Sequence, residues 1–434
     1  MKPTESFKSL ADWLPWLESL SPREIVLGLD RVQAVLQNLD IARPETVITV
    51  AGTNGKGSSI AMLEAILRQQ GIRTGSFTSP HVHRYNERTR IDGQPASDEA
   101  IISALATVES ARGDTPLTFF EFGTLATLVA FAAAGVDAWL LEVGMGGRLD
   151  AVNAIEPDGC LITNVALDHC AWLGDDVESI AAEKAGIMRA GKPVVFGSTS
   201  LPDAIVRIAA ETGADLVLAG RDFGFSVNTN RSWTWRGQRF VIENIAPPKL
   251  QGDVQFENAA NVLALLEALE RDDLLVAQDI SAALAGIRLD GRFQRRGDRW
   301  VLDVAHNPAA AEVLAGQLES LERQGQVIAI VGMLADKDVP AFVAPLNRVV
   351  DRFIAVSIDA ARGTGAQALA VKIANSANKP CQVIEDLPDA LAAACAIAAE
   401  DDLLLVTGSF YIVGPALQWI DRNGSTTCAT ELSR

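Results

Sequence analysis

A glycine-rich turn that carries one lysine and one serine is the clearest candidate for chemistry in this sequence. The apolar run 47–50 leads into Gly52-Thr-Asn-Gly-Lys-Gly-Ser58, and helical apolar spacing follows up to Gly71. Glycines let the backbone N–H groups wrap a phosphate, and a helix N-terminus adds positive potential. Lys56 would neutralise phosphate charge, and Ser58 could reach a magnesium ion. The loop is shorter than the common Gly-x4-Gly-Lys-Ser/Thr pattern, so an ordinary glycine turn is the alternative.

Polar side chains also stand at the ends of two other apolar runs. The run 138–143 carries Glu142 near its end, and the run 160–165 leads into Asp168-His169. Ligands of open α/β sheets bind at the carboxyl ends of the strands, and Mg²⁺ prefers oxygen ligands. Glu142 is therefore a candidate magnesium ligand, with a glutamate that simply faces water as the alternative. A single histidine such as His169 is more often structural, but its setting repeats that of Glu142.

Lys184 stands in a helical pattern where an apolar side chain would be expected. Val177, Ile180, Ala181 and Ile187 share one face, and Lys184 falls on it. The alternative is a lysine whose stem is buried and whose ammonium reaches water. Burial of the whole side chain would lower the lysine pKa, and a neutral amine can take up CO₂ to form a carbamate.

Strand-like and helix-like patterns alternate along the chain, which predicts an α/β fold with a mainly parallel sheet. Predicted strands cover residues 47–50, 138–143, 160–165, 193–197, 299–304, 327–331, 353–357 and 403–407. Predicted helices cover residues 58–70, 123–134, 177–190, 258–270, 309–323 and 387–399. The pattern restarts after Leu289, so we expect a phosphate-loop domain over residues 1–289 and a smaller Rossmann-like domain over 290–434. The irregular residues 224–251 predict a β-hairpin region.

Composition excludes several classes of protein. The 434 residues carry a formal net charge of -18, which disfavours binding to nucleic acid and to anionic lipid. The longest apolar stretch, residues 124–136, is too short to span a membrane and predicts a buried helix. The N-terminus shows no signal-peptide pattern, and no Cys-x-x-Cys pair occurs among the five cysteines. We therefore expect a cytoplasmic protein with reduced thiols.

The phosphate loop resembles that of the Mur ligase superfamily, which includes the folylpolyglutamate and dihydrofolate synthases. These enzymes form an acyl phosphate from a carboxylate and ATP, and an amine then attacks it. Glu183-Lys184-Ala185-Gly186-Ile187 matches the segment whose lysine is carboxylated in the family. The resemblance also implies two Mg²⁺ sites, with Ser79 of Ser79-Pro80-His81, Glu142 and His169 as metal ligands.

Further segments of the chain resemble the ATP site of this superfamily. They are Gln255-Phe-Glu-Asn258, Asp290-Gly-Arg292-Phe293 and Leu302-Asp303-Val-Ala-His306-Asn307-Pro308. The resemblance implies that ATP contacts Thr53, Asn54, Gly55, Lys56, Gly57, Ser58, Asn258, Arg292, Asp303 and His306. It gives Lys56, Lys184, Arg292 and His306 catalytic roles. Taken singly, Asn258 could instead cap a helix, and residues 303–308 could form a turn.

The acceptor is indicated by segments that resemble the pterin site of bacterial bifunctional folate synthases. They are Val26-Leu-Gly28-Leu-Asp30-Arg31, Thr118-Phe-Phe-Glu121 and Leu149-Asp150-Ala151. The implied pterin residues are Val26, Leu27, Gly28, Thr118, Phe119, Phe120, Glu121, Leu149, Asp150 and Ala151. Phe119 and Phe120 could stack on a flat ring, or they could simply belong to the core. The chain before the phosphate loop is also too short for the UDP-sugar domain of other Mur ligases.

The resemblance implies an ATP-dependent acid–amino-acid ligase that adds L-glutamate to dihydropteroate and to tetrahydrofolate. ATP, Mg²⁺ and these small molecules would be its partners, and we expect a monomer that binds neither nucleic acid nor membrane. A monofunctional synthase remains open as an alternative. So do a Mur-type ligase for another acceptor and a nucleotide-binding switch or motor without ligase chemistry.

Overall fold

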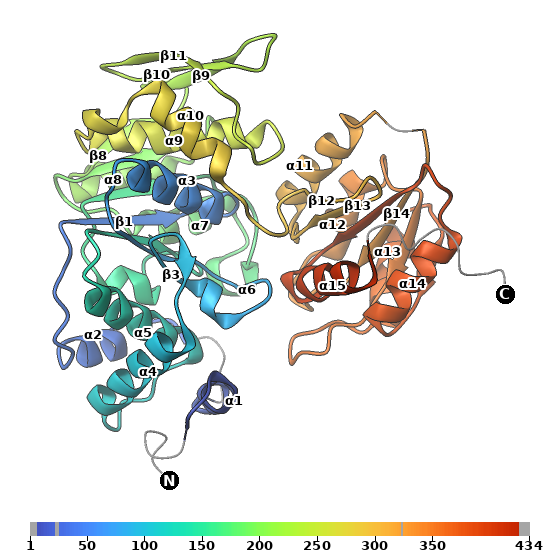
Figure 1. Cartoon of the computed structure of the whole chain (residues 1–434), viewed down its shortest axis with the longest axis horizontal. Coiled ribbons are helices and arrows are strands. Elements are labelled where there is room, and N and C mark those ends of the chain that lie inside the picture. The colour runs from blue at the N-terminus through green and yellow to red at the C-terminus, as the bar shows by residue number, and fades with distance from the viewer. Residues whose placement is uncertain (1–6, 22–25, 323, 425–434) are drawn as a thin grey trace. The chain divides into compact units, whose positions relative to one another are not determined.

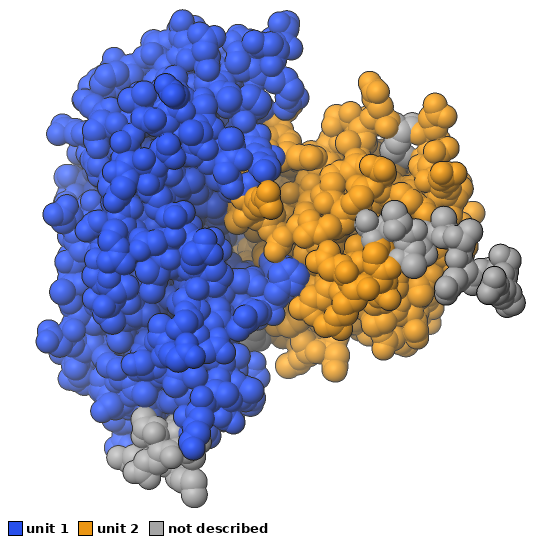
Figure 2. Space-filling model, viewed as in Figure 1, with its two compact units in different colours: residues 1–165, 175–249, 255–287 blue, residues 166–174, 250–254, 288–434 orange. Residues whose placement is uncertain are grey.

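The computed structural model describes residues 7–21, 26–322 and 324–424 of the chain. These residues form two compact units, which Figure 2 shows in different colours. Unit 1 comprises Met1–Val165, Asp175–Lys249 and Gln255–Ile287. Unit 2 comprises Arg288–Arg434 and two short segments, Ala166–Gly174 and Leu250–Val254, which interrupt unit 1 in the sequence.

Unit 1 is built on a sheet with the strand order β4-β3-β2-β5-β1-β6-β7-β8. Neighbouring strands pair in parallel from β2 to β8, and β3 and β4 add an antiparallel edge. The central strands are apolar and buried because helices cover both faces of the sheet. The strands are β1 (Thr46–Ala51), β2 (Thr74–Phe77), β3 (Thr89–Ile91), β4 (Gln94–Pro95), β5 (Ala138–Glu142), β6 (Gly159–Ile162), β7 (Pro193–Phe196) and β8 (Asp215–Leu218).

Helices α3, α9 and α10 lie on one side of this sheet, whereas α5 lies on the other (Figure 1). Apolar side chains of α5, α7 and α8 form one core with β1, β5, β6 and β7. A second core joins α1, α2, α4 and α5. The helices are α1 (Leu10–Ser19), α2 (Asp30–Leu36), α3 (Lys56–Gln69), α4 (Asp98–Arg112), α5 (Phe119–Ala134), α7 (Val177–Ala185), α8 (Asp203–Thr212), α9 (Val254–Ala268) and α10 (Ala277–Gly286), with 3-10 turns at Tyr85–Arg88, Ala151–Ala154 and Asp272–Leu274.

A separate antiparallel sheet of β9 (Gly224–Val227), β10 (Trp233–Arg236) and β11 (Val241–Ile245) lies beside α9 and α10 (Figure 1). Trp233 and Trp235 are fully buried, and the indole of Trp235 donates to the carbonyl oxygen of Ala260 in α9. The buried carboxylate of Glu267 accepts three backbone N–H groups from the β10–β11 turn. Residues 224–251 therefore form the hairpin region that the sequence predicts.

Unit 2 contains a sheet with the order β12-β13-β17-β14-β15-β16, parallel except for the edge strand β12. One hydrophobic core joins this sheet to α11, α12 and α13. The strands are β12 (Gln294–Arg296), β13 (Trp300–Asp303), β14 (Val327–Val331), β15 (Arg352–Ala355), β16 (Cys381–Val383) and β17 (Leu403–Thr407). The helices are α6 (Cys170–Leu173), α11 (Pro308–Glu319), α12 (Val339–Leu346), α13 (Ala366–Ser376), α14 (Leu387–Ile397) and α15 (Phe410–Asn423).

The predicted fold class is confirmed, and some predicted details are wrong. Helix α7 ends at Ala185 rather than at residue 190. Gly186 is its C-cap, and a Cβ atom there would lie 2.3 Å from Arg148 Cβ. Val177 is exposed, so the buried face of α7 is narrower than predicted. Asn258 lies inside α9 and does not cap it.

The composition predicts that the chain has no membrane-spanning helix and that its cysteines are reduced. Among the described residues, no helix is long and apolar enough to cross a membrane. Cys160, Cys170 and Cys381 carry free thiols, but Cys395 is disulfide-bonded. The prediction that all cysteines are reduced is therefore wrong for Cys395. Cys428 lies outside the described residues.

Candidate active site

The predicted phosphate loop joins β1 to α3 at the carboxyl end of the central parallel strand. Gly52 has φ +144, and a Cβ atom there would lie 1.8 Å from the hydroxyl oxygen of Thr163. Gly55 has φ +87 and immediately precedes α3. Both positions thus require glycine, and the first turn of α3 directs its backbone N–H groups towards the loop. This is the geometry expected of an anion site at a helix N-terminus.

The loop is braced by two residues that follow β6, the strand beside β1. The side-chain oxygen of Asn164 accepts from Asn54 N at 3.0 Å, and its amide donates to Asn54 O at 3.1 Å. Its backbone carbonyl accepts from Thr53 N, and the Thr163 hydroxyl donates to Asn54 O at 2.6 Å. Thr163 and Asn164 are absent from the predicted site, since only the pairing of β6 with β1 brings them to the loop.

Lys56 and Lys184 meet at the same backbone atom of the loop. Lys56 Nζ donates to the carbonyl oxygens of Gly52 at 3.1 Å and Thr53 at 3.3 Å. Lys184 Nζ donates to Gly52 O at 3.1 Å, and its side chain is buried. The alternative of a lysine that reaches water is therefore wrong for Lys184. Its ammonium group lies beside the phosphate loop.

Asn258 also contacts the phosphate loop. A Cβ atom at Gly55 would lie 2.5 Å from Asn258 Oδ1, so the amide packs directly on the backbone. The amide nitrogen of Asn258 donates to Gln255 Oε1 at 3.1 Å. Of the predicted ATP residues, 53–58 and Asn258 thus form one group in unit 1.

Ser79 follows β2 by two residues, and Glu142 is the last residue of the neighbouring strand β5. The backbone N–H of Ser79 donates to Glu142 Oε2 at 3.1 Å, and Glu142 is buried. No cluster of three or more His, Cys, Asp or Glu side chains that could hold a metal occurs in the part of the chain that the structure describes. A hydroxyl and a carboxylate still fit Mg²⁺, which binds few protein ligands and keeps waters or phosphate oxygens. The third predicted ligand, His169, belongs to unit 2.

In unit 2, three side chains converge on the carboxylate of Asp168, the residue before His169. Lys337 Nζ donates to Asp168 Oδ1 at 2.5 Å, and Asn307 Nδ2 donates to Oδ2 at 3.0 Å. His306 Nε2 lies 3.5 Å from Oδ2. Burial opposes the charge of Asp168, but His306, His169 and Lys337 hold the pKa of that carboxyl well below its usual range. The predicted ATP residue His306 is therefore one of the polar side chains around Asp168.

The other predicted ATP residues of unit 2 lie around the start of β12 and the end of β13. Asp303 is the last residue of β13, and it accepts from Phe293 N at 2.7 Å and Ala305 N at 2.8 Å. Burial raises the pKa of Asp303 above its ordinary value. The Arg292 guanidinium lies 5.3 Å from the ring centroid of Phe410, and His306 packs near the same ring. Arg292, Asp303 and His306 thus share one region.

The predicted acceptor segments are joined by hydrogen bonds within unit 1. The backbone N–H of Gly28 donates to Leu149 O at 3.5 Å. Arg31 Nη2 donates to Val26 O at 2.7 Å and to Glu121 Oε1 at 2.6 Å. The three segments, separate in the sequence, therefore meet in the fold, and Arg31, which the predicted set lacks, makes one of the hydrogen bonds that join them.

Aromatic side chains and one buried carboxyl line this region. Phe119 and Phe120 are half-buried: both rings pack against the hydrophobic core of unit 1, and part of each stays exposed. The Arg88 guanidinium lies 5.4 Å from the ring centroid of Phe119. Asp150 accepts from the backbone N–H groups of Met145 and Val152. Burial nevertheless raises the pKa of Asp150 to about 7.

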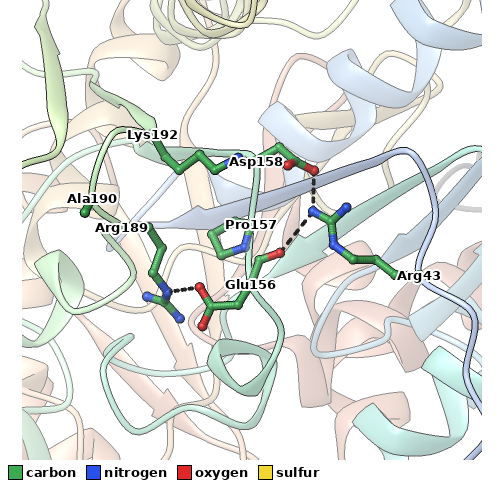
Figure 3. Close-up of a pocket in the computed structure, with 7 residues that line it drawn as sticks. All are labelled: Arg43, Glu156, Pro157, Asp158, Arg189, Ala190 and Lys192. Carbon is green, nitrogen blue, oxygen red and sulfur yellow. Dashed lines mark hydrogen bonds and ion pairs between the residues drawn. The ribbon is translucent and has the colours of Figure 1, made fainter.

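A hollow of about 580 Å³ lies elsewhere in unit 1, near the start of β1, β6 and β7 (Figure 3). Its cations are paired with its carboxylates: Arg43 and Lys192 with Asp158, and Arg189 with Glu156. The phosphate loop follows the opposite, carboxyl end of β1. We therefore assign this hollow no part in the chemistry.

Comparisons with known proteins identify the family of this chain. Residues 50–266 match the Mur ligase middle domain, and residues 291–410 match the Mur ligase glutamate ligase domain. A dihydrofolate synthase/folylpolyglutamate synthase from Escherichia coli (strain K12) is 41% identical over 421 residues, which cover 96% of each chain.

Solved structures that are similar to this chain are also folate synthases. E. coli FolC in complex with DHPP and ADP has a TM-score of 0.90 and 40% identity, covering 96% of this chain and 98% of that one. A bifunctional folylpolyglutamate synthase/dihydrofolate synthase with Mn, AMPPNP and L-glutamate bound has a TM-score of 0.89 and 39% identity, covering 97% and 100%. This chain therefore belongs to the Mur ligase family and, within it, to the dihydrofolate synthase/folylpolyglutamate synthases.

Proposed function

We propose that this chain is an ATP-dependent ligase that adds L-glutamate to dihydropteroate and to tetrahydrofolate through an acyl phosphate. The observation that carries the proposal is the convergence of Lys56 and the buried Lys184 on Gly52 of the phosphate loop. The named ligands of the relatives are consistent with it: DHPP and ADP in one structure, and Mn, AMPPNP and L-glutamate in the other. A nucleotide switch without ligase chemistry gives no reason for a lysine in the position of Lys184.

The phosphate loop holds the triphosphate of ATP in this proposal. The N–H groups of the first turn of α3 bind phosphate oxygens, and Lys56 exchanges its bonds to Gly52 and Thr53 for the β- and γ-phosphates. Asn164 keeps the loop in shape while the ligand binds. Asn258 contacts the nucleotide on the side of Gly55.

Ser79, Glu142 and His169 would hold Mg²⁺. Magnesium held there would offset the charge that develops during phosphoryl transfer. Carboxylation of Lys184 would place a carboxylate beside the phosphate loop and replace one of two neighbouring positive charges. A second metal ion would need further oxygen ligands, and the Lys184 carbamate could supply them.

The reaction then proceeds in two balanced steps. The acceptor carboxylate attacks the γ-phosphorus of ATP, so that an acyl phosphate forms and ADP leaves. The amine of L-glutamate attacks the acyl carbon, loses a proton, and displaces inorganic phosphate as the amide bond forms. In the first step, Lys56 and Arg292 offset the negative charge on the phosphate oxygens. Exclusion of water protects the acyl phosphate from hydrolysis until glutamate attacks.

Each part of the chain has an assigned role in this proposal. Residues 1–289 bind ATP and the pterin, with Asp150, Phe119 and Phe120 against the ring. Residues 290–434 supply the glutamate side of the site, with Asp303 and His306 towards the nucleotide. We further propose a cytoplasmic monomer that binds neither nucleic acid nor membrane, and sedimentation at enzyme concentration tests the monomer.

ADP release with Mg-ATP and L-glutamate tests the function directly. We expect release with dihydropteroate and with tetrahydrofolate, and only background release without an acceptor. Release with one acceptor alone would make the enzyme monofunctional. Release with neither, from folded protein that still binds ATP, would contradict the folate assignment and leave a Mur-type ligase for another acceptor.

A further inference from the structure

Arg31 makes contacts that link two segments of the proposed acceptor site. Its Nη2 atom donates to Val26 O at 2.7 Å and to Glu121 Oε1 at 2.6 Å, and its Nε atom lies 3.4 Å from Glu121 Oε2. The guanidinium therefore meets the carboxylate through both oxygens while it holds the backbone at Val26. Only a planar, several-donor side chain can make these bonds together.

Glu121 is committed to the start of α5 by further bonds. Its Oε2 accepts from the backbone N–H of Thr118 at 2.8 Å, while the Thr118 hydroxyl accepts from Glu121 N at 3.3 Å. This reciprocal capping box fixes the first turn of α5, which carries Phe119 and Phe120. The Glu121 side chain is 5% exposed and that of Arg31 is 25% exposed, so the ion pair is largely shielded from water.

The backbone on the other side of Arg31 continues the network. Gly28 lies two residues after Val26, and its N–H donates to the carbonyl oxygen of Leu149, the residue before the buried Asp150. Gly28 has φ +142, which favours glycine, so the chain turns sharply between Val26 and Arg31. One guanidinium thus joins the backbone of residues 26–28 to the helix that carries the aromatic pair.

We infer that Arg31 is a positioning residue of the acceptor site, which sets the distance between the 26–28 backbone and the N-terminus of α5. The inference rests on the proposed function, since it assigns these segments to the pterin. Arg31 acts through Val26 and Glu121 and not by contact with the reacting atoms. Its loss should loosen the acceptor site and leave the phosphate loop unchanged.

The test compares steady-state kinetics of Arg31→Met, Arg31→Lys and Glu121→Gln with the parent enzyme. We expect Arg31→Met to raise the KM for dihydropteroate about tenfold, since it loses charge-assisted bonds, with kcat and the KM for ATP changed less than twofold. Arg31→Lys keeps the charge but can make fewer bonds, so its KM should be intermediate. The matched control is Arg43→Met, which removes an arginine paired with Asp158 at the hollow of Figure 3.

A double-variant cycle tests whether Arg31 affects the KM for the acceptor through its ion pair with Glu121. Arg31→Met combined with Glu121→Gln should raise the KM no more than the worse single variant, because both act through one ion pair. An unchanged acceptor KM in Arg31→Met with a parent-like melting temperature would overturn the inference. So would an equal rise in the KM for ATP. If Arg31→Met does not fold, Arg31→Lys decides, and an acceptor KM equal to that of the parent overturns the inference.

Failure of the proposed function gives a different result. In that case the parent enzyme itself releases no ADP with either pterin acceptor. An active parent with an unaltered Arg31→Met variant contradicts only the role of Arg31.

Discussion

Lys56 and Lys184 lie in different helices of unit 1, yet both ammonium groups donate to the carbonyl oxygen of Gly52. Two positive charges thus lie beside the phosphate loop, so this corner of the loop favours an anion. A phosphate group and a lysine carbamate each satisfy that requirement. Removing the buried charge of Lys184 should therefore affect catalysis more than folding.

We expect Lys184→Ala to lower kcat at least about a hundredfold, because the variant loses a charged group at the site of phosphoryl transfer. Assays of ADP release with and without added short carboxylic acids measure this. If Lys184 is carboxylated, acids that fill the vacated space should partly restore turnover. Lys192→Ala, which removes a surface lysine paired with Asp158, is the control. Full activity of Lys184→Ala would rule out the carbamate.

Asn164→Ala should raise the KM for ATP about tenfold, because the side chain makes two hydrogen bonds to the backbone of Asn54. The KM for the acceptor should change little, since these bonds shape only the phosphate loop. Asn38→Ala removes an exposed asparagine that bonds to the backbone of Ala111, and it serves as the control. An unaltered KM for ATP would show that the loop keeps its shape without the amide.

Asp168→Ala should destabilise unit 2 by about 3–5 kcal/mol, because it leaves the buried ammonium of Lys337 without its main counter-charge. Urea denaturation followed by tryptophan fluorescence measures the change. The double variant Asp168→Ala/Lys337→Met should recover much of the loss, since neither charge then remains. The exposed pair Arg296–Asp421 provides the control, where Asp421→Ala should cost less than about 1 kcal/mol. Equal losses at the two aspartates would contradict the prediction.

Asp150 should make the stability of the folded protein depend on pH. Burial raises the pKa of its carboxyl to about 7, so the folded state keeps a proton that the unfolded state releases near pH 4. The contribution of this group is therefore full below about pH 4 and is lost as the pH rises towards 7. Asp150→Asn should remove that part of the decline. The asparagine also loses a hydrogen bond of the Asp150 carboxylate, but this loss lowers stability by the same amount at every pH, because asparagine does not titrate.

Melting temperatures of the parent and Asp150→Asn between pH 4 and pH 8 measure this difference. Parallel curves would show that Asp150 stays ionised in the folded protein. Asp176→Asn makes the same change at the exposed N-cap of α7, so it shows the effect of an aspartate-to-asparagine substitution at a site that is not buried.

The sequence predicts the parts of this fold that local patterns determine. β1, β5, β14 and β17 are buried apolar runs between turns, and their predicted positions agree with the structure to within a residue. The end of α7 is not marked by apolar spacing, since Ile187 continues the apolar pattern beyond the C-cap residue Gly186, which packs against Arg148. Glycine in a helical pattern gives only a weak signal for a helix end.

The candidate site shows the same division between local and non-local information. The loop around Lys56 and the burial of Lys184 follow from patterns within single segments. The brace by Asn164 requires the knowledge that β6 lies beside β1 in the sheet. The link from Arg31 to Glu121 joins residues on different helices, and nothing in either segment alone indicates the other.

The chain crosses from one unit to the other after Val165, Gly174, Lys249, Val254 and Ile287. The two units are therefore interleaved in the gene, although each is compact in space. A polypeptide that spans only residues 288–434 would lack Asp168, whose carboxylate binds the buried Lys337. The segment 288–434 is thus not the whole of unit 2, and recombination that transferred it in one piece would leave Lys337 without this carboxylate.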